Sequence, residues 1–137
     1  MGADALINID VDDLGRAAAF YTGALGLKLG RRFGAAAVEL TGSTSPIYLL
    51  AKAENSPAGP ATGERRRYVR HWTPVHLDFV VADLDAALER ALAVGAALDE
   101  PPTTHPWGKT AHLADPFGHG LCLIEFVGRG YDEIATP

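Results

Sequence analysis

One short pattern occurs twice in the chain. Alternating apolar and polar residues at 7–11 and at 77–81 are each followed by an Asp-Leu pair and an alanine-rich run. The alternation is typical of a strand with one packed and one open face. The aspartates, Asp13 and Asp83, stand where a side chain can accept hydrogen bonds from the free amides of a first helical turn. The sequence therefore predicts two modules, each beginning with a strand and a helix.

The helices are predicted from apolar residues spaced three and four apart, over 14–25 and from residue 84 to residue 94. Each segment ends at a glycine, Gly26 or Gly95, which tolerates a left-handed cap. A single unit of this kind would leave part of its sheet uncovered. The duplication therefore predicts two modules that complete one another, with the functional site between them.

The remaining segments complete one domain that spans 1–137. Module one is expected at 5–52, with further strands at 27–32, 35–41 and 47–51. Residues 53–73 form a predicted linker and candidate lid, because the stretch 53–63 has a composition that neither helix nor strand tolerates: Asn55, Ser56, Pro57, Gly59, Pro60 and Gly63. Module two is expected at 74–127, with strands at 96–99, 109–114 and 121–127 and a Pro-rich turn after the first of these. The tail, 128–137, is expected to wrap on the surface or fray.

Composition narrows the class of protein. The chain has 137 residues, of which 47% are hydrophobic, yet no apolar run approaches the roughly 20 residues needed to cross a bilayer. The single cysteine, Cys122, excludes an internal disulfide, and the first residues lack a signal-peptide pattern, so we expect a cytoplasmic protein. The net charge of -5 argues against a nucleic-acid partner. The main basic cluster is interpreted as a solvated loop, with anion binding as the alternative, and comprises Arg65, Arg66, Arg67 and Arg70.

Several of these segments resemble one protein family. The duplicated start, Phe20-Tyr21, Leu25-Gly26-Leu27 and the Asp115-Pro-Phe-Gly-His119 turn before a final strand resemble the vicinal oxygen chelate superfamily. That superfamily includes glyoxalase I, bleomycin and fosfomycin resistance proteins, and extradiol dioxygenases. The resemblance covers residues 5–127 and implies an α+β fold. In that fold, paired βαβββ modules form an open, eight-stranded, barrel-like sheet with a central cavity, often in a homodimer.

The resemblance also implies where a metal would bind. Members that hold a metal take one ligand from the first strand and one from the last strand of each module. In module two these positions carry His76 and Glu125, both able to bind a divalent ion. In module one they carry Leu6 and Ala51, which cannot. The resemblance thus implies an incomplete site for one divalent metal ion of unknown identity.

Strand parity predicts that His76 and Glu125 both face the cavity. Three roles stay open for them. They can hydrogen-bond to each other as a satisfied acid and base without metal. They can hold a metal with help from Asp78 or Asn8, whose oxygens lie on suitable faces. They can also act as a general acid and base on a bound substrate.

Other residues are candidates for contacting a ligand. Asn8 either orients a ligand or only meets water, and Asp78 shares the face of His76. Trp72 and the His105–Trp107 corner lie in predicted loops, where they either line the rim of the pocket or plug the ends of the barrel. Tyr48 and Cys122 are assigned to the helix side, and His112 and His119 receive no catalytic role. An apolar set is predicted to line the cavity: Leu6, Ile47, Leu49, Leu121 and Leu123.

The leading hypothesis is a glyoxalase/bleomycin-resistance-like protein that binds a small, largely apolar molecule between its modules, with His76 and Glu125 as the polar anchor. The alternative is a metal-dependent lyase, isomerase or dioxygenase that uses these two residues as ligands. A third hypothesis is a protein that sequesters a drug-like compound without turnover.

Overall fold

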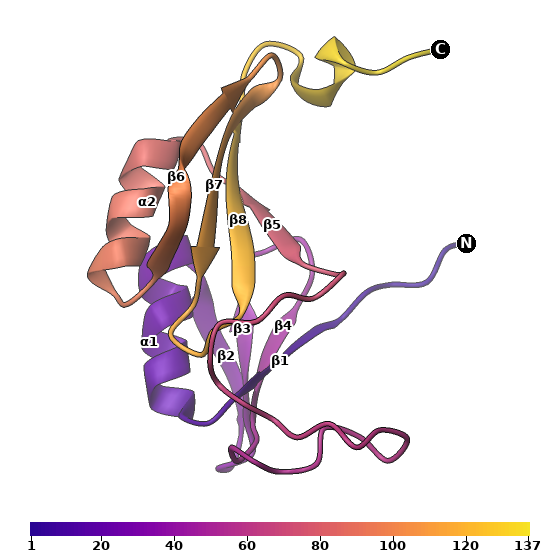
Figure 1. Cartoon of the computed structure of the whole chain (residues 1–137), viewed down its shortest axis with the longest axis vertical. Helices are drawn as coiled ribbons and strands as arrows, with labels where there is room; N and C mark the ends of the chain where they lie inside the picture. The colour runs from indigo at the N-terminus through magenta and orange to yellow at the C-terminus, as the bar shows by residue number, and fades with distance from the viewer. The chain divides into compact units, whose positions relative to one another are not determined.

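The computed structural model describes residues 1–137 and consists of two units, Met1–Val69 and Arg70–Pro137. Each unit contains one βαβββ module (Figure 1). The elements of module one are β1 (Ile7–Val11), α1 (Leu14–Leu25), β2 (Lys28–Phe33), β3 (Ala37–Thr41) and β4 (Ile47–Ala51). The elements of module two are β5 (Leu77–Val80), α2 (Leu84–Ala93), β6 (Ala97–His105), β7 (Gly108–Ala114) and β8 (Gly120–Phe126), followed by the 3-10 helix η1 (Gly130–Glu133).

The two modules share one sheet topology. The strand order is β1-β4-β3-β2 in the first and β5-β8-β7-β6 in the second, and the first strand of each pairs in parallel with the last. All other pairs are antiparallel. The predicted α+β fold of paired βαβββ modules is therefore confirmed. The eight strands form two four-stranded sheets and do not close into one barrel.

Local hydrogen bonds explain where the helices begin and end. The Asp13 side chain accepts from the Arg16 amide at 3.0 Å, and the Asp83 side chain accepts from the Ala86 amide at 3.1 Å. Helix α1 ends at Gly26, which has a φ of 68° and donates its N–H to the Thr22 carbonyl. The repeated Asp-Leu pattern therefore sets the start of both helices, as predicted.

Each helix packs on one face of its own sheet, α1 on β3 and β4 and α2 on β7 and β8. The largest fully buried side chains are shared between these layers: Phe20, Tyr21, Leu40, Ile47 and Leu49 in module one, and Leu84, Leu113, Phe117 and Leu123 in module two. Ile47, Leu49 and Leu123 are thus core residues, and their predicted place on the cavity face is wrong, whereas Leu121 is 5% exposed and lines a hollow of the second unit.

Tyr48 lies on the opposite face of β4 from Ile47 and Leu49, which corrects its predicted place on the helix side. Its hydroxyl donates to Glu39 Oε2 at 3.1 Å, and Arg31 pairs with the same carboxylate at 2.7 Å. Hydrogen bonds from Arg31 hold the pKa of Glu39 at about 2, well below its usual value. The open face of the first sheet therefore carries a polar network at this point.

Strand β6 is longer than predicted. It runs through Pro101 and Pro102, where the sequence indicates a turn, and its pairing with β7 shifts register between Leu98 and Thr103. Proline lacks an amide donor and is tolerated at the edge of a sheet, and β6 is the edge strand. Strand β6 therefore continues through the two prolines.

The predicted linker, 53–73, contains the boundary between the units and is partly folded. Arg66 Nε pairs with Asp10 Oδ2 at 2.7 Å, and the Tyr68 hydroxyl donates to the Lys52 carbonyl at 2.6 Å. These contacts hold residues 53–69 against module one. Arg66 is paired, so the solvated-loop interpretation is wrong for this residue.

Neither helix has the length and apolar character that crossing a membrane would require.

Candidate functional site

Five titratable side chains cross the second sheet in one line, which we call the polar row: His76, Asp78, Cys122, His112 and Glu100. Strand register explains the alignment. Asp78 pairs with Cys122, Cys122 pairs with His112, and His112 pairs with Glu100. Side chains of paired residues on neighbouring strands point to the same face. The row therefore lies on one face of all four strands.

Neighbouring side chains of the polar row are in contact. His76 Nε2 lies 3.2 Å from Asp78 Oδ1, and Cys122 Sγ lies 3.1 Å from His112 Nδ1. The other ring nitrogen of His112, Nε2, lies 3.6 Å from Glu100 Oε1. His76, Asp78, His112 and Glu100 are exposed, whereas Cys122 is buried. The row is thus accessible from solvent, with the thiol at its base.

Glu125 is not part of the polar row. Its Oε1 accepts a hydrogen bond from the Leu84 amide at 2.8 Å, at the start of α2. Glu125 is three residues beyond Cys122 on β8 and therefore points to the opposite, helix-covered face. The prediction that Glu125 meets His76 is wrong, and so is the prediction that Cys122 faces the helix. The residue of the last strand that faces His76 is Cys122.

The environment of Cys122 keeps its thiol protonated. Burial raises the pKa of Cys122 to about 12, and the neighbouring Asp78 carboxylate contributes in the same direction. A thiolate, not a thiol, is the nucleophile and the metal ligand in cysteine chemistry. At neutral pH the row therefore holds a neutral thiol between Asp78 and His112.

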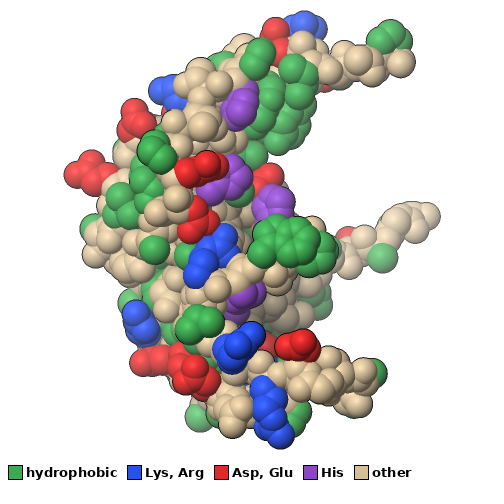
Figure 2. Space-filling model, viewed as in Figure 1, with side chains coloured by type: hydrophobic (Ala, Val, Ile, Leu, Met, Phe, Trp, Pro, Cys, Tyr) green, Lys and Arg blue, Asp and Glu red, His purple; other side chains and the backbone are tan.

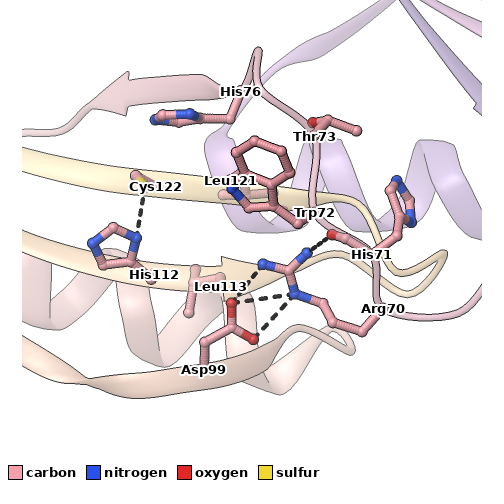
Figure 3. A pocket seen from close by; sticks show the side chains of 11 residues that line it. Arg70, His71, Trp72, Thr73, His76, Asp99, His112, Leu113, Leu121 and Cys122 are labelled. Atoms are coloured by element: carbon pink, nitrogen blue, oxygen red, sulfur yellow. Dashed lines mark hydrogen bonds and ion pairs between the residues drawn. The ribbon is translucent and has the colours of Figure 1, made fainter.

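A first hollow, of about 170 Å³, lies beside one side of the polar row (Figure 3). Arg70, Trp72 and Asp99 line it together with His76, His112 and Cys122. Arg70 Nη2 pairs with Asp99 Oδ2 at 2.7 Å, which lowers the pKa of Asp99 and raises that of Arg70. The predicted solvated or anion-binding role of Arg70 is therefore replaced by an ion pair. The Trp72 side chain is 80% exposed.

A second hollow, of about 220 Å³, also contains His76, His112 and Cys122 in its lining. It adds Asp78 and Thr110 from the sheet, and His105, Trp107 and Tyr131 from the end of the β6–β7 hairpin and from η1. The His105 ring is held by Thr103, whose hydroxyl lies 3.0 Å from Nε2. Histidines and acidic side chains are visible together on the face drawn in Figure 2.

The sequence-predicted ligand residues divide between the modules. Trp72 and Trp107 each line a hollow, and His105 and Asp78 line the second one, while their contact with a ligand stays a prediction. Asn8 is exposed on β1 of module one, opposite Tyr48 in the parallel register. Sequence reasoning missed His112, Cys122, Glu100 and Tyr131. On β7, polar Thr110 and His112 alternate with apolar Ala111 and Leu113. This alternation is the sequence signal that places His112 on the open face of the sheet.

Three residues of the polar row form a group able to hold a metal ion. Donor atoms of His76, Asp78 and Cys122 all lie within 4.8 Å of one another. One imidazole nitrogen, one carboxylate oxygen and one sulfur are a donor set typical of Zn²⁺, because sulfur is a poor ligand for the harder ions Mg²⁺ and Ca²⁺. The residues present therefore fit a borderline or soft divalent ion.

Comparisons with known proteins agree with this fold. Residues 6–124 match the family model described as a glyoxalase-like domain. A variant of the fosfomycin resistance protein FosX from Listeria monocytogenes, solved with Mn(II) and 1S,2S-dihydroxypropylphosphonic acid, superposes with a TM-score of 0.72. It is 16% identical, over 98% of this chain and 96% of that one. A glyoxalase/bleomycin resistance protein/dioxygenase family enzyme from Burkholderia phytofirmans has a TM-score of 0.69 and 20% identity, over 91% and 100%.

A sequence relative is the anthracycline biosynthesis protein DnrV from Streptomyces peucetius, which is 30% identical over 138 residues. The match covers 98% of this chain but 45% of DnrV, so the chain spans less than half the length of that relative. The family model, by contrast, covers most of the chain and both of its modules. This chain therefore belongs to the glyoxalase-like domain family.

Proposed function

We propose that the open face of module two binds a small, largely apolar organic molecule, and that the polar row hydrogen-bonds to the few polar groups of that molecule. The observation that carries the proposal is the register-aligned polar row with a hollow on either side. His76 and His112 offer ring nitrogens that donate or accept, and Asp78 offers an acceptor, so a hydroxyl or carbonyl of the ligand finds partners along the row. DnrV, named for anthracycline biosynthesis, and FosX, solved with an organic phosphonate, support a small-molecule role.

The polar row also suits proton transfer to or from such a ligand. An imidazole ring can accept or donate a proton, and His112 lies between a neutral thiol and the Glu100 carboxylate. A ligand hydroxyl or a C–H beside a carbonyl, held in the second hollow, would meet His76 or His112 directly. The homodimer, the cytoplasmic location and the site between the modules stay predictions.

Replacement of His112 by alanine is expected to weaken ligand binding about tenfold, the effect of one lost hydrogen bond of about 1.4 kcal/mol. The measurement is a screen of hydroxylated and keto compounds by ligand-observed NMR, followed by Kd values for the tightest binder. Glu125→Gln is the matched control, because Gln keeps an acceptor for the Leu84 amide. Equal losses in both variants, or a loss only in Glu125→Gln, would contradict the proposal.

A second candidate function is metal-dependent chemistry, favoured by the donor group of His76, Asp78 and Cys122. These three residues would hold the ion, and Leu6 and Ala51 of module one contribute no donor. A bound divalent ion supplies Lewis-acid polarisation of a ligand oxygen. His112, beside the sulfur, would then orient the Cys122 side chain.

Cobalt(II) is expected to bind with an affinity that rises with pH. Because the pKa of Cys122 is about 12, the ion must displace the thiol proton, and affinity should increase by about tenfold per pH unit across the neutral range. The readout is the thiolate-to-cobalt charge-transfer band in a titration at pH 6.5, 7.5 and 8.5. Because Cys122 is the single cysteine, the band reports its sulfur as a ligand. His76→Ala should weaken cobalt(II) binding and Glu125→Gln should keep it. Absence of the band in wild-type protein, or an affinity unchanged by His76→Ala, excludes this site.

A further inference from the structure

Four aromatic rings gather at one end of the second module, and we call them the aromatic corner: His105, Trp107, Phe126 and Tyr131. The His105 and Trp107 rings are stacked, with centroids 4.8 Å apart and planes 2° from parallel. Tyr131 packs against Trp107 at 4.9 Å and edge-on against Phe126 at 4.8 Å. Three separate segments of the chain therefore contribute to one cluster.

Backbone contacts fix the aromatic corner in place. The Val127 amide donates to the Trp107 carbonyl at 2.9 Å, and the Gly130 amide donates to the Val127 carbonyl at 2.9 Å. Gly130 has a φ of 61°, and a Cβ there would lie 3.3 Å from the Phe126 ring. The turn that leads into η1 therefore needs glycine, and it delivers Tyr131 to the face of Trp107. The predicted fraying of the tail does not apply to this turn.

The aromatic corner is not a closed core. Tyr131 is 48% exposed, and His105, Trp107 and Tyr131 all line the second hollow. Ile124 forms part of the lining from the sheet, and His76, Asp78 and His112 complete it. One end of the hollow is therefore made of flat rings and the other of hydrogen-bonding groups.

This division of the hollow suits a particular shape of ligand. The Trp107 ring already stacks on His105 and contacts Tyr131, so a ligand ring would pack on the half-exposed Tyr131 ring and along the edge of the stack. An aromatic ring packed face-on or edge-on against these rings gains attraction beyond the area it buries, whereas a saturated ring of the same size gains only the burial. A hydroxyl or carbonyl on the far edge of the aromatic ring would reach the histidines of the polar row. We propose that the second hollow is a stacking site for a flat aromatic molecule with a hydroxyl or carbonyl at one edge; this rests on the proposed function.

The test compares two primary alcohols with the same hydroxyl-bearing side chain, 2-(2-naphthyl)ethanol and 2-(decahydro-2-naphthyl)ethanol, whose ring systems differ in aromaticity. Wild-type protein is expected to bind the naphthyl alcohol about tenfold more tightly, the upper end of what aromatic contacts contribute. Trp107→Leu and Tyr131→Leu should each reduce this preference to threefold or less. Phe33→Leu, which changes a 44% exposed ring on β2 of module one, is the matched control and should keep it. Tyr131→Leu changes a half-exposed side chain, so the test stands even where Trp107→Leu fails to fold.

The outcomes separate this inference from the proposed function. Equal affinity for the two probes in wild-type protein overturns the aromatic stacking site but leaves small-molecule binding intact. A preference that survives Tyr131→Leu and Trp107→Leu, or that is lost in Phe33→Leu, likewise overturns it. If neither probe binds, the inference fails, and the wider screen of hydroxylated and keto compounds decides the proposed function by itself.

Discussion

Replacement of Gly108 by alanine is expected to destabilise the protein by about 3 kcal/mol, the upper end of the cost of adding a methyl group where no space exists. A Cβ at this position would overlap the carbonyl oxygen of Glu125 and lie 3.1 Å from the Phe126 Cα. Both obstacles are backbone atoms of the neighbouring strand, so the paired ends of β7 and β8 must separate. Trp107, the residue before Gly108, would lose its position in the aromatic corner.

The free energy of unfolding from urea denaturation measures this effect, and near-UV circular dichroism reports the environment of Trp107. Gly63→Ala is the matched control, because no atom lies within 4 Å of its Cβ position. We expect the control to change stability by less than about 0.5 kcal/mol, as at other unstrained surface positions. Equal stability of the two variants would contradict the close approach of β7 and β8 at Gly108.

Replacement of Asp115 by alanine is expected to cost about 2–4 kcal/mol, since two amides lose their partner at a buried site. Asp115 is 3% exposed, and its Oδ1 accepts from the Phe117 amide at 2.8 Å and from the His119 amide at 3.0 Å. These bonds shape the turn between β7 and β8. The turn sets the register that aligns Cys122 with His112, so the variant should also lose the polar row.

Asp115→Asn provides the comparison for this prediction. Asparagine keeps one side-chain oxygen as an acceptor, so its loss of stability should be less than half that of Asp115→Ala. Thermal unfolding followed by circular dichroism distinguishes the two variants. If Asp115→Asn and Asp115→Ala lose the same stability, hydrogen bonding by Oδ1 does not explain the turn.

Helix positions were predictable from the sequence because their determinants are local. Asp13 and Asp83 accept from amides three residues ahead, and Gly26 closes α1 through its own conformation. Each of these contacts involves residues within one helical turn or its ends. The repeat of the pattern then predicts the second module from the first.

The face of β8 was not predictable in the same way. Leu121, Cys122, Leu123 and Ile124 are all apolar and all buried, so alternation along the strand does not distinguish the open face from the packed one. Glu125 is polar and suggests the wrong face, because its carboxylate is used at the start of α2. Only the pairing of Cys122 with Asp78 and His112 identifies the open face, and that register depends on the whole sheet.

The aromatic corner depends on contacts between segments that are distant in sequence. The sequence places Trp107 in a predicted loop, but its partner Tyr131 lies in a tail whose apolar residues show no regular spacing. The positive φ of Gly130 and the hydrogen bond from the Val127 amide to the Trp107 carbonyl bring the two rings together. Composition predicts a surface tail here, and tertiary contacts place one of its side chains, Tyr131, in the lining of the second hollow.

The central claim is that the open face of module two, with the polar row, is where a small molecule binds. The chain has five histidines, of which His76, His105 and His112 line the second hollow. His119 lies instead against His71, with ring nitrogens 3.2 Å apart, and lines neither hollow. The most direct measurement is NMR of protein labelled with ¹⁵N in its histidine rings, titrated with the tightest binder from the screen. The account predicts shifts at His76, His105 and His112 with His119 unchanged, whereas shifts confined to His119, or no shift at saturating binder, would contradict it.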